Sequence, residues 1–235
     1  MLALLDSDIY AYRAAAACEN EDELQAIRSV DSLIINTLMC GVDKCGYVDA
    51  WKLFLTGKGN FRNDVATTAP YKGNRADKVK PKHLAALRKH LMQEWGASMS
   101  EGQEADDTIA IEATKLGDNG VIVSLDKDLD QVQGWHYNFV KREAYYISEA
   151  EGLLRLYMQI LTGDAADNII GLRGIGNVKA KKMLEDAADE TEMFNRCIEA
   201  YDGNEDRVVE NAHLLFLRRH EGQTWTPPSN RTMWL

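Results

Sequence analysis

Acidic residues gather in short clusters that are far apart in the chain but share one chemistry. They are Asp6-Ser7-Asp8, Glu104-Ala105-Asp106-Asp107, Asp126-Lys127-Asp128 and Asp164-Ala165-Ala166-Asp167. If these carboxylates converge with no cation present, their mutual repulsion raises several pKa values sharply. A protein that collects them at one place therefore needs a divalent metal to keep them ionised.

Each cluster also has a simpler interpretation when it is taken alone. Acids in a first helical turn, as in 104–107, complement the helix dipole. Asp126 could cap a short helix, and Asp164 and Asp167, which would share a face if they lay on a helix, could cap a helix before a turn. Together, the clusters favour a metal centre over four unrelated caps.

Ligand chemistry selects the metal. Oxygen donors suit Mg²⁺, Mn²⁺ or Ca²⁺. The run Asp126-x-Asp128-x-Asp130 resembles a calcium loop, but Gln131 and Tyr137 occupy the positions that require Gly and Glu. No HExxH or paired CxxC spacing supports zinc. Two Mg²⁺ ions, with Mn²⁺ as a substitute, are therefore expected, and such pairs cleave phosphodiesters.

Positive charge is concentrated in two segments of an acidic chain. The 235 residues carry 27 Lys and Arg against 37 Asp and Glu, a net charge of −10. Lys and Arg nevertheless dominate residues 72–90 and 168–184. Basic faces on an acidic body suit a polyanionic substrate that is brought to a metal centre.

A glycine-rich turn, Gly171-Leu-Arg-Gly174-Ile-Gly176, precedes a lysine-rich helix with Lys179, Lys181 and Lys182. Its order is neither the dinucleotide-binding GxGxxG nor a Walker loop. Glycines that open a basic helix expose backbone N–H groups to phosphate, as in helix–hairpin–helix contacts with a DNA backbone. The alternative is a tight turn beside a solvated lysine face.

The pentapeptide Tyr71-Lys72-Gly73-Asn74-Arg75 combines an aromatic ring with two cations. Such a ring can stack on an unpaired base while Lys72 and Arg75 hold phosphates. In isolation, a solvated loop is the favoured interpretation of this pentapeptide.

Hydropathy patterning predicts the elements that must position these residues. Strands are expected at 1–6, 48–55, 121–125, 135–140 and 144–147. Helices are expected at 8–19, 22–40, 81–95 and 104–116, and mainly helices after 149; the stretch 56–79 is long and polar with no apolar period. Alternating strands and helices indicate an α/β fold with a mostly parallel sheet. Asp6 and Asp126 directly follow apolar strands, where such sheets build their sites.

Several classes of protein are excluded. The longest apolar stretch is too short to span a bilayer, and the N-terminus lacks a basic region before an apolar run. The four cysteines show no staple pattern, which favours reduced thiols and a cytoplasmic location, in the host if the chain is phage-encoded.

Four motifs together resemble the 5′-nuclease superfamily of flap endonucleases, the 5′-nuclease domain of bacterial DNA polymerase I and phage 5′→3′ exonucleases. They are YKGNR (71–75), EADD (104–107), SLDKDLDQV (124–132) and TGDAADNIIGLRGIG (162–176). The resemblance covers roughly residues 1–185. It implies a PIN-like nuclease core over 1–150 with a helical arch at about 57–95. A helical DNA-binding region over 151–235 would hold a helix–three-turn–helix element at about 160–185.

The same resemblance implies a role for each candidate residue. The first metal would be held by Asp6, Glu104, Asp106 and Asp107, and the second by Asp126, Asp128, Asp164 and Asp167. Lys72 and Arg75 would stabilise charge on the scissile phosphate, and Arg13 would lie near the 5′ side. Tyr71 would stack on the 5′ base, Gly174, Gly176 and the lysines would contact duplex DNA, and carbonyls of 171–176 would hold K⁺.

One departure concerns the end of the second predicted strand. The superfamily usually has an aspartate there, whereas this chain reads Leu55-Thr56-Gly57-Lys58. Losing one ligand weakens a metal site without abolishing it, because many acids remain.

The sequence therefore predicts a divalent-metal-dependent, structure-specific 5′ nuclease acting in DNA replication or repair. Its substrate would be DNA with 5′ ends, flaps or nicks, with a polymerase or single-strand-binding protein as candidate partners, no membrane and a monomeric state. A PIN-type ribonuclease and a catalytically weak DNA-junction-binding protein are the alternatives.

Overall fold

A computed structural model describes residues 1–75 and 78–228. Residues 76–77, within the predicted arch, and 229–235, within the predicted helical region, lie outside the described residues. The side chain of Cys40 is also outside the description.

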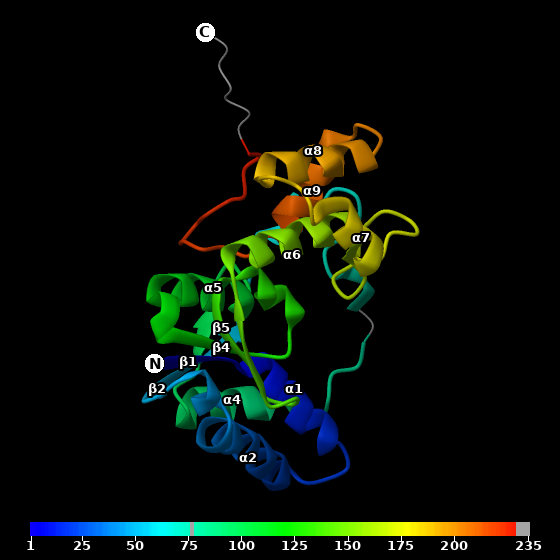
Figure 1. Ribbon diagram of the computed structural model, residues 1–235. Helices are drawn as coiled ribbons and strands as arrows, with labels where there is room; N and C mark the ends of the chain where they lie inside the picture. The colour runs from blue at the N-terminus through cyan, green and yellow to red at the C-terminus, as the bar shows by residue number, and fades with distance from the viewer. Residues whose placement is uncertain (76–77, 229–235) are drawn as a thin grey trace.

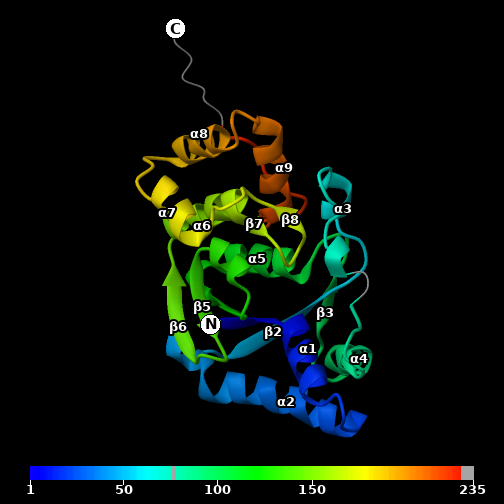
Figure 2. The same ribbon diagram turned by 90° about the vertical axis from the view of Figure 1, so that its right-hand side faces the viewer.

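A six-stranded sheet in the order β3-β2-β1-β4-β5-β6 forms the centre of the structure (Figures 1 and 2). Its strands are β1 (Leu2–Asp6), β2 (Ala50–Thr56), β3 (Ser98–Ser100), β4 (Gly120–Val123), β5 (Gly134–Asn138) and β6 (Glu143–Ile147). Strands β1 to β5 pair in parallel and β6 is antiparallel to β5. The predicted α/β fold with a mostly parallel sheet is confirmed.

Helices cover both faces of this sheet. Figure 2 shows α1 (Ser7–Ala17), α2 (Glu23–Cys40) and α4 (Leu84–Glu94) below the sheet and α5 (Ala105–Leu116) above it. Successive strand residues point to opposite faces. Leu53 and Leu55 therefore join the cluster with α1, α2 and α4, whereas Phe54 packs with α5.

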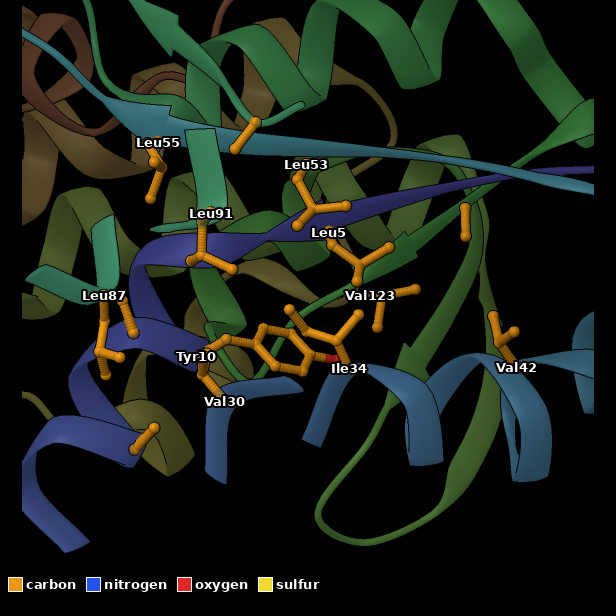
Figure 3. Close-up of a cluster of buried hydrophobic side chains, with 14 of the residues drawn as sticks. Leu5, Tyr10, Val30, Ile34, Val42, Leu53, Leu55, Leu87, Leu91 and Val123 are labelled. Atoms are coloured by element: carbon orange, nitrogen blue, oxygen red, sulfur yellow. The ribbon is translucent and has the colours of Figure 1, made fainter. Parts of the chain in front are cut away.

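The larger core lies between the sheet and the three helices below it (Figure 3). Leu5, Leu53 and Val123 of the central strands meet Tyr10 of α1 and Ile34 of α2 there. Each such side chain contributes about 1.5–3 kcal/mol when it is fully buried. This packing fixes the positions of the β1 and β4 ends, from which the site is built.

A second cluster joins the helices that follow the sheet, namely α6 (Glu149–Thr162), α7 (Asn177–Leu184), α8 (Glu190–Ala200) and α9 (Glu205–Leu215). Ser148 and Glu151 cap each other at the start of α6. The predicted domain boundary near residue 150 falls at this helix start, and the division into two domains remains a prediction. The helix–three-turn–helix element is likewise a prediction.

Several short elements were not predicted, and one helical placement was wrong. The polar stretch 56–79 contains α3 (Arg62–Val65) and a 3₁₀ turn, η2 (Gly73–Arg75), and the edge strand β3 had no strand signal. Asp164 and Asp167 are not on a helix but in a hairpin of β7 (Gly163–Asp164) and β8 (Ile169–Ile170). Gly163 ends α6 with a φ of 66°, a conformation that favours glycine.

The remaining short elements are the 3₁₀ turns η1 (Val42–Cys45), η3 (Gly117–Asn119) and η4 (Lys127–Gln131). Cys18, Cys45 and Cys197 are buried free thiols. In the part of the chain that the structure describes, no helix combines the length and apolar character that crossing a membrane requires.

Glu210 of α9 fastens the polar stretch to the helical cluster. Its carboxylate accepts bonds from the Thr67 and Thr68 amides, both at 2.7 Å, and pairs with Arg207 at 2.5 Å. Burial opposes ionisation, but the bonds from Thr68 and Thr67 outweigh it and lower the pKa of Glu210 to about 2 from 4.5.

The Glu210→Gln variant is therefore expected to be less stable than the parent at pH 7, on the order of 2 kcal/mol. A lowered folded pKa stabilises the protein fully above the unfolded value and loses that effect as pH falls toward the folded value. The gap in the free energy of unfolding should thus shrink between pH 4.5 and 2. Urea unfolding across this range measures it, and a gap independent of pH would contradict the expectation.

Candidate functional site

A large cleft opens at the carboxyl ends of the central strands. It has a volume of about 1230 Å³ and is lined from the sheet edge, the α5 start, the polar stretch and the β7–β8 hairpin. Asp6 ends β1, and Asp126 follows the neighbouring strand β4 after two further residues. The sheet thus brings together carboxylates that are far apart in sequence, as the strand-end pattern predicted.

Hydrogen bonds orient the acids at the β1 and β4 ends. The Ser124 hydroxyl donates to Asp6 Oδ2 at 2.9 Å and accepts the Asp126 amide at 3.0 Å. Asp126 Oδ1 then accepts the Asp128 amide at 2.9 Å. Gln159 of α6 donates to Asp128 Oδ1 at 2.6 Å, so Asp128 is held from the helical cluster as well.

The start of α5 brings a second group of acids to the same cleft. The Ala105 amide donates to Thr56 Oγ1 at 3.0 Å, which fixes the α5 N-terminus against the end of β2. Glu104 is the N-cap and Asp106 lies in the first turn, and both line the cleft.

Burial and like charge act together on these carboxylates. Burial, with the charge of Asp126, raises the pKa of Asp6 to about 7 against the Ser124 hydrogen bond. Burial and the charges of Asp6 and Asp126 raise the pKa of Asp106 well above its usual range. Asp126 is more open to solvent, but the surrounding protein still raises its pKa by desolvation. Burial raises the pKa of Asp128 to about 7, with added repulsion from Asp126 and Asp164.

This donor set fits a divalent cation. Carboxylates that are crowded together and repel one another are stabilised by a bound positive charge. Their donors are oxygens, which suits Mg²⁺ or Mn²⁺. Among the described residues, however, no three carboxylate, thiol or imidazole side chains stand in ligand geometry around one point.

Cations of the chain itself occupy part of the cleft. Lys72 Nζ forms a short ion pair with Glu104 and lies 3.5 Å from Asp167 Oδ2. Arg75 Nη2 lies 2.5 Å from Asp167 Oδ1. The sequence predicts metal binding for Glu104 and Asp167 and phosphate binding for Lys72 and Arg75. In this structure these acidic and basic side chains pair with each other.

Tyr71 lies in a different place from the one expected for a base-stacking ring. Its side chain packs in the helical cluster, and only 9% of the residue is exposed. Its hydroxyl lies 2.8 Å from Glu104 Oε2 and 2.7 Å from Asp167 Oδ2. With the ring covered and the hydroxyl engaged, Tyr71 joins two acid clusters and does not present a stacking surface in this structure.

Asp107 is not brought to the cleft. Its carboxylate faces Arg62 of α3, with Nη1–Oδ2 at 2.6 Å and Nη2–Oδ1 at 3.0 Å, and both side chains are buried. Its Oδ1 also accepts the Arg218 amide at 3.2 Å. The structure does not place Asp107 in the cleft with the other expected ligands, because its carboxylate is engaged by the buried Arg62 guanidinium. Nothing in the spacing of Arg62 pointed to this pair.

The missing strand-end aspartate has a steric explanation. A Cβ on Gly57 would lie 2.0 Å from the Ser100 carbonyl oxygen of β3, so this backbone admits only glycine. Asp8 lines the cleft nearby and accepts the Thr56 amide at 2.7 Å, while Arg88 of α4 forms a short ion pair with it. Asp8 and Arg88 are cleft residues that the predicted site residues did not include.

Other predicted contacts lie around the cleft or outside it. Arg13 is exposed on α1 and is not among the residues that line the cleft. Gly176 lines it, and Gly174 has a φ of 79° that suits glycine. Lys179, Lys181 and Lys182 are exposed on α7, and Lys179 donates to the Gly174 carbonyl at 2.9 Å.

Arg155 of α6 also lines the cleft and was not predicted. Its Nη2 lies 3.5 Å from Asp128 Oδ1, and its Nε is buried with no hydrogen-bond partner among the described residues. Arg155 and Gln159 are four residues apart and share a helical face. This spacing indicates a role in the site only once that face of α6 is known to line the cleft.

Comparison with known sequences finds relatives of one kind, although no family model matches the chain. The chain is 35% identical over 132 residues to thermostable DNA polymerase I of Thermus aquaticus, across 49% of this chain and 16% of that protein. It is 34% identical over 116 residues to flap endonuclease Xni of Shewanella woodyi, across 44% of this chain and 46% of that protein. The chain thus spans less than half of the length of either relative.

Solved structures share the fold more completely. The flap endonuclease of bacteriophage T5, in a complex with DNA and metal ions, matches 91% of this chain and 88% of its own, with a TM-score of 0.67 at 17% identity. The catalytic core of Rad2 with DNA matches 80% of this chain and 61% of its own, with a TM-score of 0.52 at 14% identity.

The fold and the site together define this chain as an α/β protein with an acid-lined cleft at the carboxyl edge of a mostly parallel sheet. The relatives and fold neighbours named above are DNA polymerase I, flap endonuclease and Rad2 proteins, and the resemblance to the 5′-nuclease superfamily that the motifs predicted is confirmed.

Proposed function

We propose that this protein is a divalent-metal-dependent, structure-specific 5′ nuclease that hydrolyses phosphodiester bonds of DNA in phage or bacterial replication or repair. The observation that carries the proposal is the convergence of acids from four segments on one cleft that also holds Lys72 and Arg75. The flap endonuclease and polymerase I relatives support it.

The carboxylates divide into two groups that would hold two Mg²⁺ ions, with Mn²⁺ as a substitute. Asp6, Glu104 and Asp106 would hold one, and Asp126, Asp128, Asp164 and Asp167 the other. When bound, such ions supply a water of lowered pKa and neutralise charge on the leaving oxygen. The Ser124 hydroxyl donates to the Asp6 carboxylate and accepts the Asp126 amide, so it holds that side chain and the Asp126 backbone at the cleft.

The chain's own cations bind the substrate in this proposal. Lys72 and Arg75 line the cleft and would contact the scissile phosphate, where positive charge stabilises the transition state. The turn 171–176 and the α7 lysines would hold the duplex backbone, with K⁺ on the turn carbonyls. The substrate would be DNA with 5′ ends, flaps or nicks, bound by a monomer in the cytoplasm, with a polymerase or single-strand-binding protein as partner.

Cleavage of a 5′-labelled flap and a matching nicked duplex tests this function. Short 5′ products are expected in Mg²⁺, none in EDTA, and about a 100-fold loss or more in Asp126→Ala. Asp118→Ala, which removes an acid outside the cleft, is the matched control and should cleave like the parent. Product length separates exonuclease from flap cutting, and an RNA flap cut in preference to DNA would favour the ribonuclease alternative.

A catalytically weak DNA-junction-binding protein is the second candidate, because Gly57 stands where the superfamily usually has an aspartate. Tight binding of the flap without cleavage in either Mg²⁺ or Mn²⁺ would favour it.

Duplex binding should depend strongly on salt. Each phosphate neutralised by Lys or Arg contributes about 0.9 to the slope of log K against log salt. We expect the Lys179→Met, Lys182→Met double variant to lower that slope by about 2 and to weaken binding equally for all duplex sequences. Fluorescence anisotropy between low and moderate salt measures this. An unchanged slope would mean that the α7 lysines do not contact DNA phosphates.

A further inference from the structure

The segment 70–75 is fastened directly to the β7–β8 turn. Its bonds are Lys72 N to Asp167 O at 2.8 Å, Asn74 Nδ2 to Ala165 O at 2.7 Å, Arg75 Nε to Ala166 O at 2.9 Å, and Asn168 Nδ2 to Pro70 O at 2.9 Å. These bonds hold the two basic side chains over the acids of the cleft. The contact between the two segments therefore rests on bonds to backbone groups and not only on the long side chains of Lys72 and Arg75.

Lys72 supplies the charge that this contact needs. The Tyr71 hydroxyl has one proton to donate but lies within hydrogen-bond distance of both Glu104 and Asp167. The carboxylate that does not receive this proton needs a positively charged partner. The Lys72 ammonium supplies it, because it lies within ion-pair distance of both Glu104 and Asp167. Burial lowers the pKa of Lys72, but the charges of Glu104 and Asp167 outweigh this and raise it, so the ammonium stays charged.

We propose that Lys72 is an internal counter-ion that the divalent cations of the two proposed sites displace from Glu104 and Asp167, and that this displacement frees Lys72 and Arg75 to bind the phosphate of the substrate. The proposal deepens the proposed function and rests on it for the identity of the cleft as a metal site. In this proposal, metal binding releases the side chains that then bind phosphate, so the two events form one switch.

Three features allow Lys72 to leave. An ammonium carries one charge and no fixed geometry, whereas a divalent cation carries two and gathers several oxygens. The Lys72 side chain is 28% exposed, so it can turn to solvent. Its backbone has a φ of 53°, which is unfavourable for a non-glycine residue and is relieved if the segment rearranges.

The switch has a thermodynamic consequence. If the cation and Lys72 compete for the same carboxylates, removing the ammonium raises affinity for the cation. In the parent protein, a bound cation should raise the affinity for phosphate, and by reciprocity bound phosphate should raise the affinity for the cation by the same factor.

Mn²⁺ binding without DNA tests the competition directly. Free Mn²⁺ is followed by electron paramagnetic resonance during titration of the parent, Lys72→Met and Lys127→Met. Lys127 is exposed and lines the same cleft beside Asp126 and Asp128, so its variant removes the same charge without removing the contact. Thermal unfolding in EDTA establishes that each variant is folded.

Lys72→Met is expected to bind Mn²⁺ about fivefold more tightly or better, the usual range of a coupling between sites. Lys127→Met should change affinity by less than about twofold, because water screens an exposed charge. Equal tightening in both variants would show a general charge effect and overturn the proposal. Unchanged or weaker binding in Lys72→Met would overturn it too.

Hydrogen exchange provides a second readout. Saturating Mg²⁺ should speed exchange of the Lys72 and Arg75 amides, which are bonded in the docked segment. Slower or unchanged exchange would contradict displacement. If the parent binds no Mn²⁺ at all, the proposed function loses its metal centre; if it binds and cleaves but Lys72→Met binds alike, only the switch fails.

Discussion

Replacing Asp106 by asparagine is expected to abolish cleavage while making the metal-free protein harder to unfold. Burial and the charges of Asp6 and Asp126 make the Asp106 carboxylate unfavourable where it lies. Asparagine has nearly the same shape and no charge, so it relieves the repulsion in the absence of metal. The same change removes a ligand from the proposed site, and we expect activity to fall about 100-fold or more.

The stability gain should be about 1–2 kcal/mol in EDTA, or a few degrees in Tm for a chain of this size. Differential scanning calorimetry in EDTA and flap cleavage in Mg²⁺ measure the two effects on one preparation. Added Mg²⁺ should stabilise the parent more than the variant, since only the parent keeps the full ligand set. A variant less stable than the parent in EDTA would mean that Asp106 supports the fold and not the metal.

The sequence predicts the sheet and one edge of the site well because both depend on local pattern. Apolar runs that end in Asp6 and precede Asp126 mark strand ends, and parallel pairing then brings those ends together. The start of α5 is likewise local, since Glu104 caps a helix with clear apolar periodicity.

The rest of the site depends on contacts between distant residues. Asp106 and Asp107 are adjacent and chemically identical, and only Arg62, 45 positions earlier, separates their roles. The sequence around Tyr71 indicates a ring that could stack on a base, but in the structure the helical cluster covers that ring. The edge strand β3 has too few residues for a pattern, and it is β3 that excludes a side chain at Gly57.

Loss of the Arg62–Asp107 pair is expected to cost the most stability of any single change considered. Arg62 is 1% exposed and donates to Asp107 and to the carbonyls of Leu214 and Phe216, so it joins α3, α5 and the end of α9. Asp107→Ala leaves this guanidinium buried without its counter-ion, which costs about 3–5 kcal/mol. Tm should fall by roughly 10 °C.

A double-mutant cycle separates the buried charge from the lost packing. Arg62→Met alone leaves Asp107 without its guanidinium partner, whereas the double variant removes both charges and retains an apolar side chain at residue 62. We expect the double variant to be more stable than the sum of the single changes implies, with a coupling of about 1–3 kcal/mol in urea unfolding. Additive losses would mean that the pair contributes only through independent bonds. Because Asp107 shares the first turn of α5 with Asp106, a strong coupling would also show that the helix start supplying the proposed metal ligands is held in place from the opposite side by a buried ion pair.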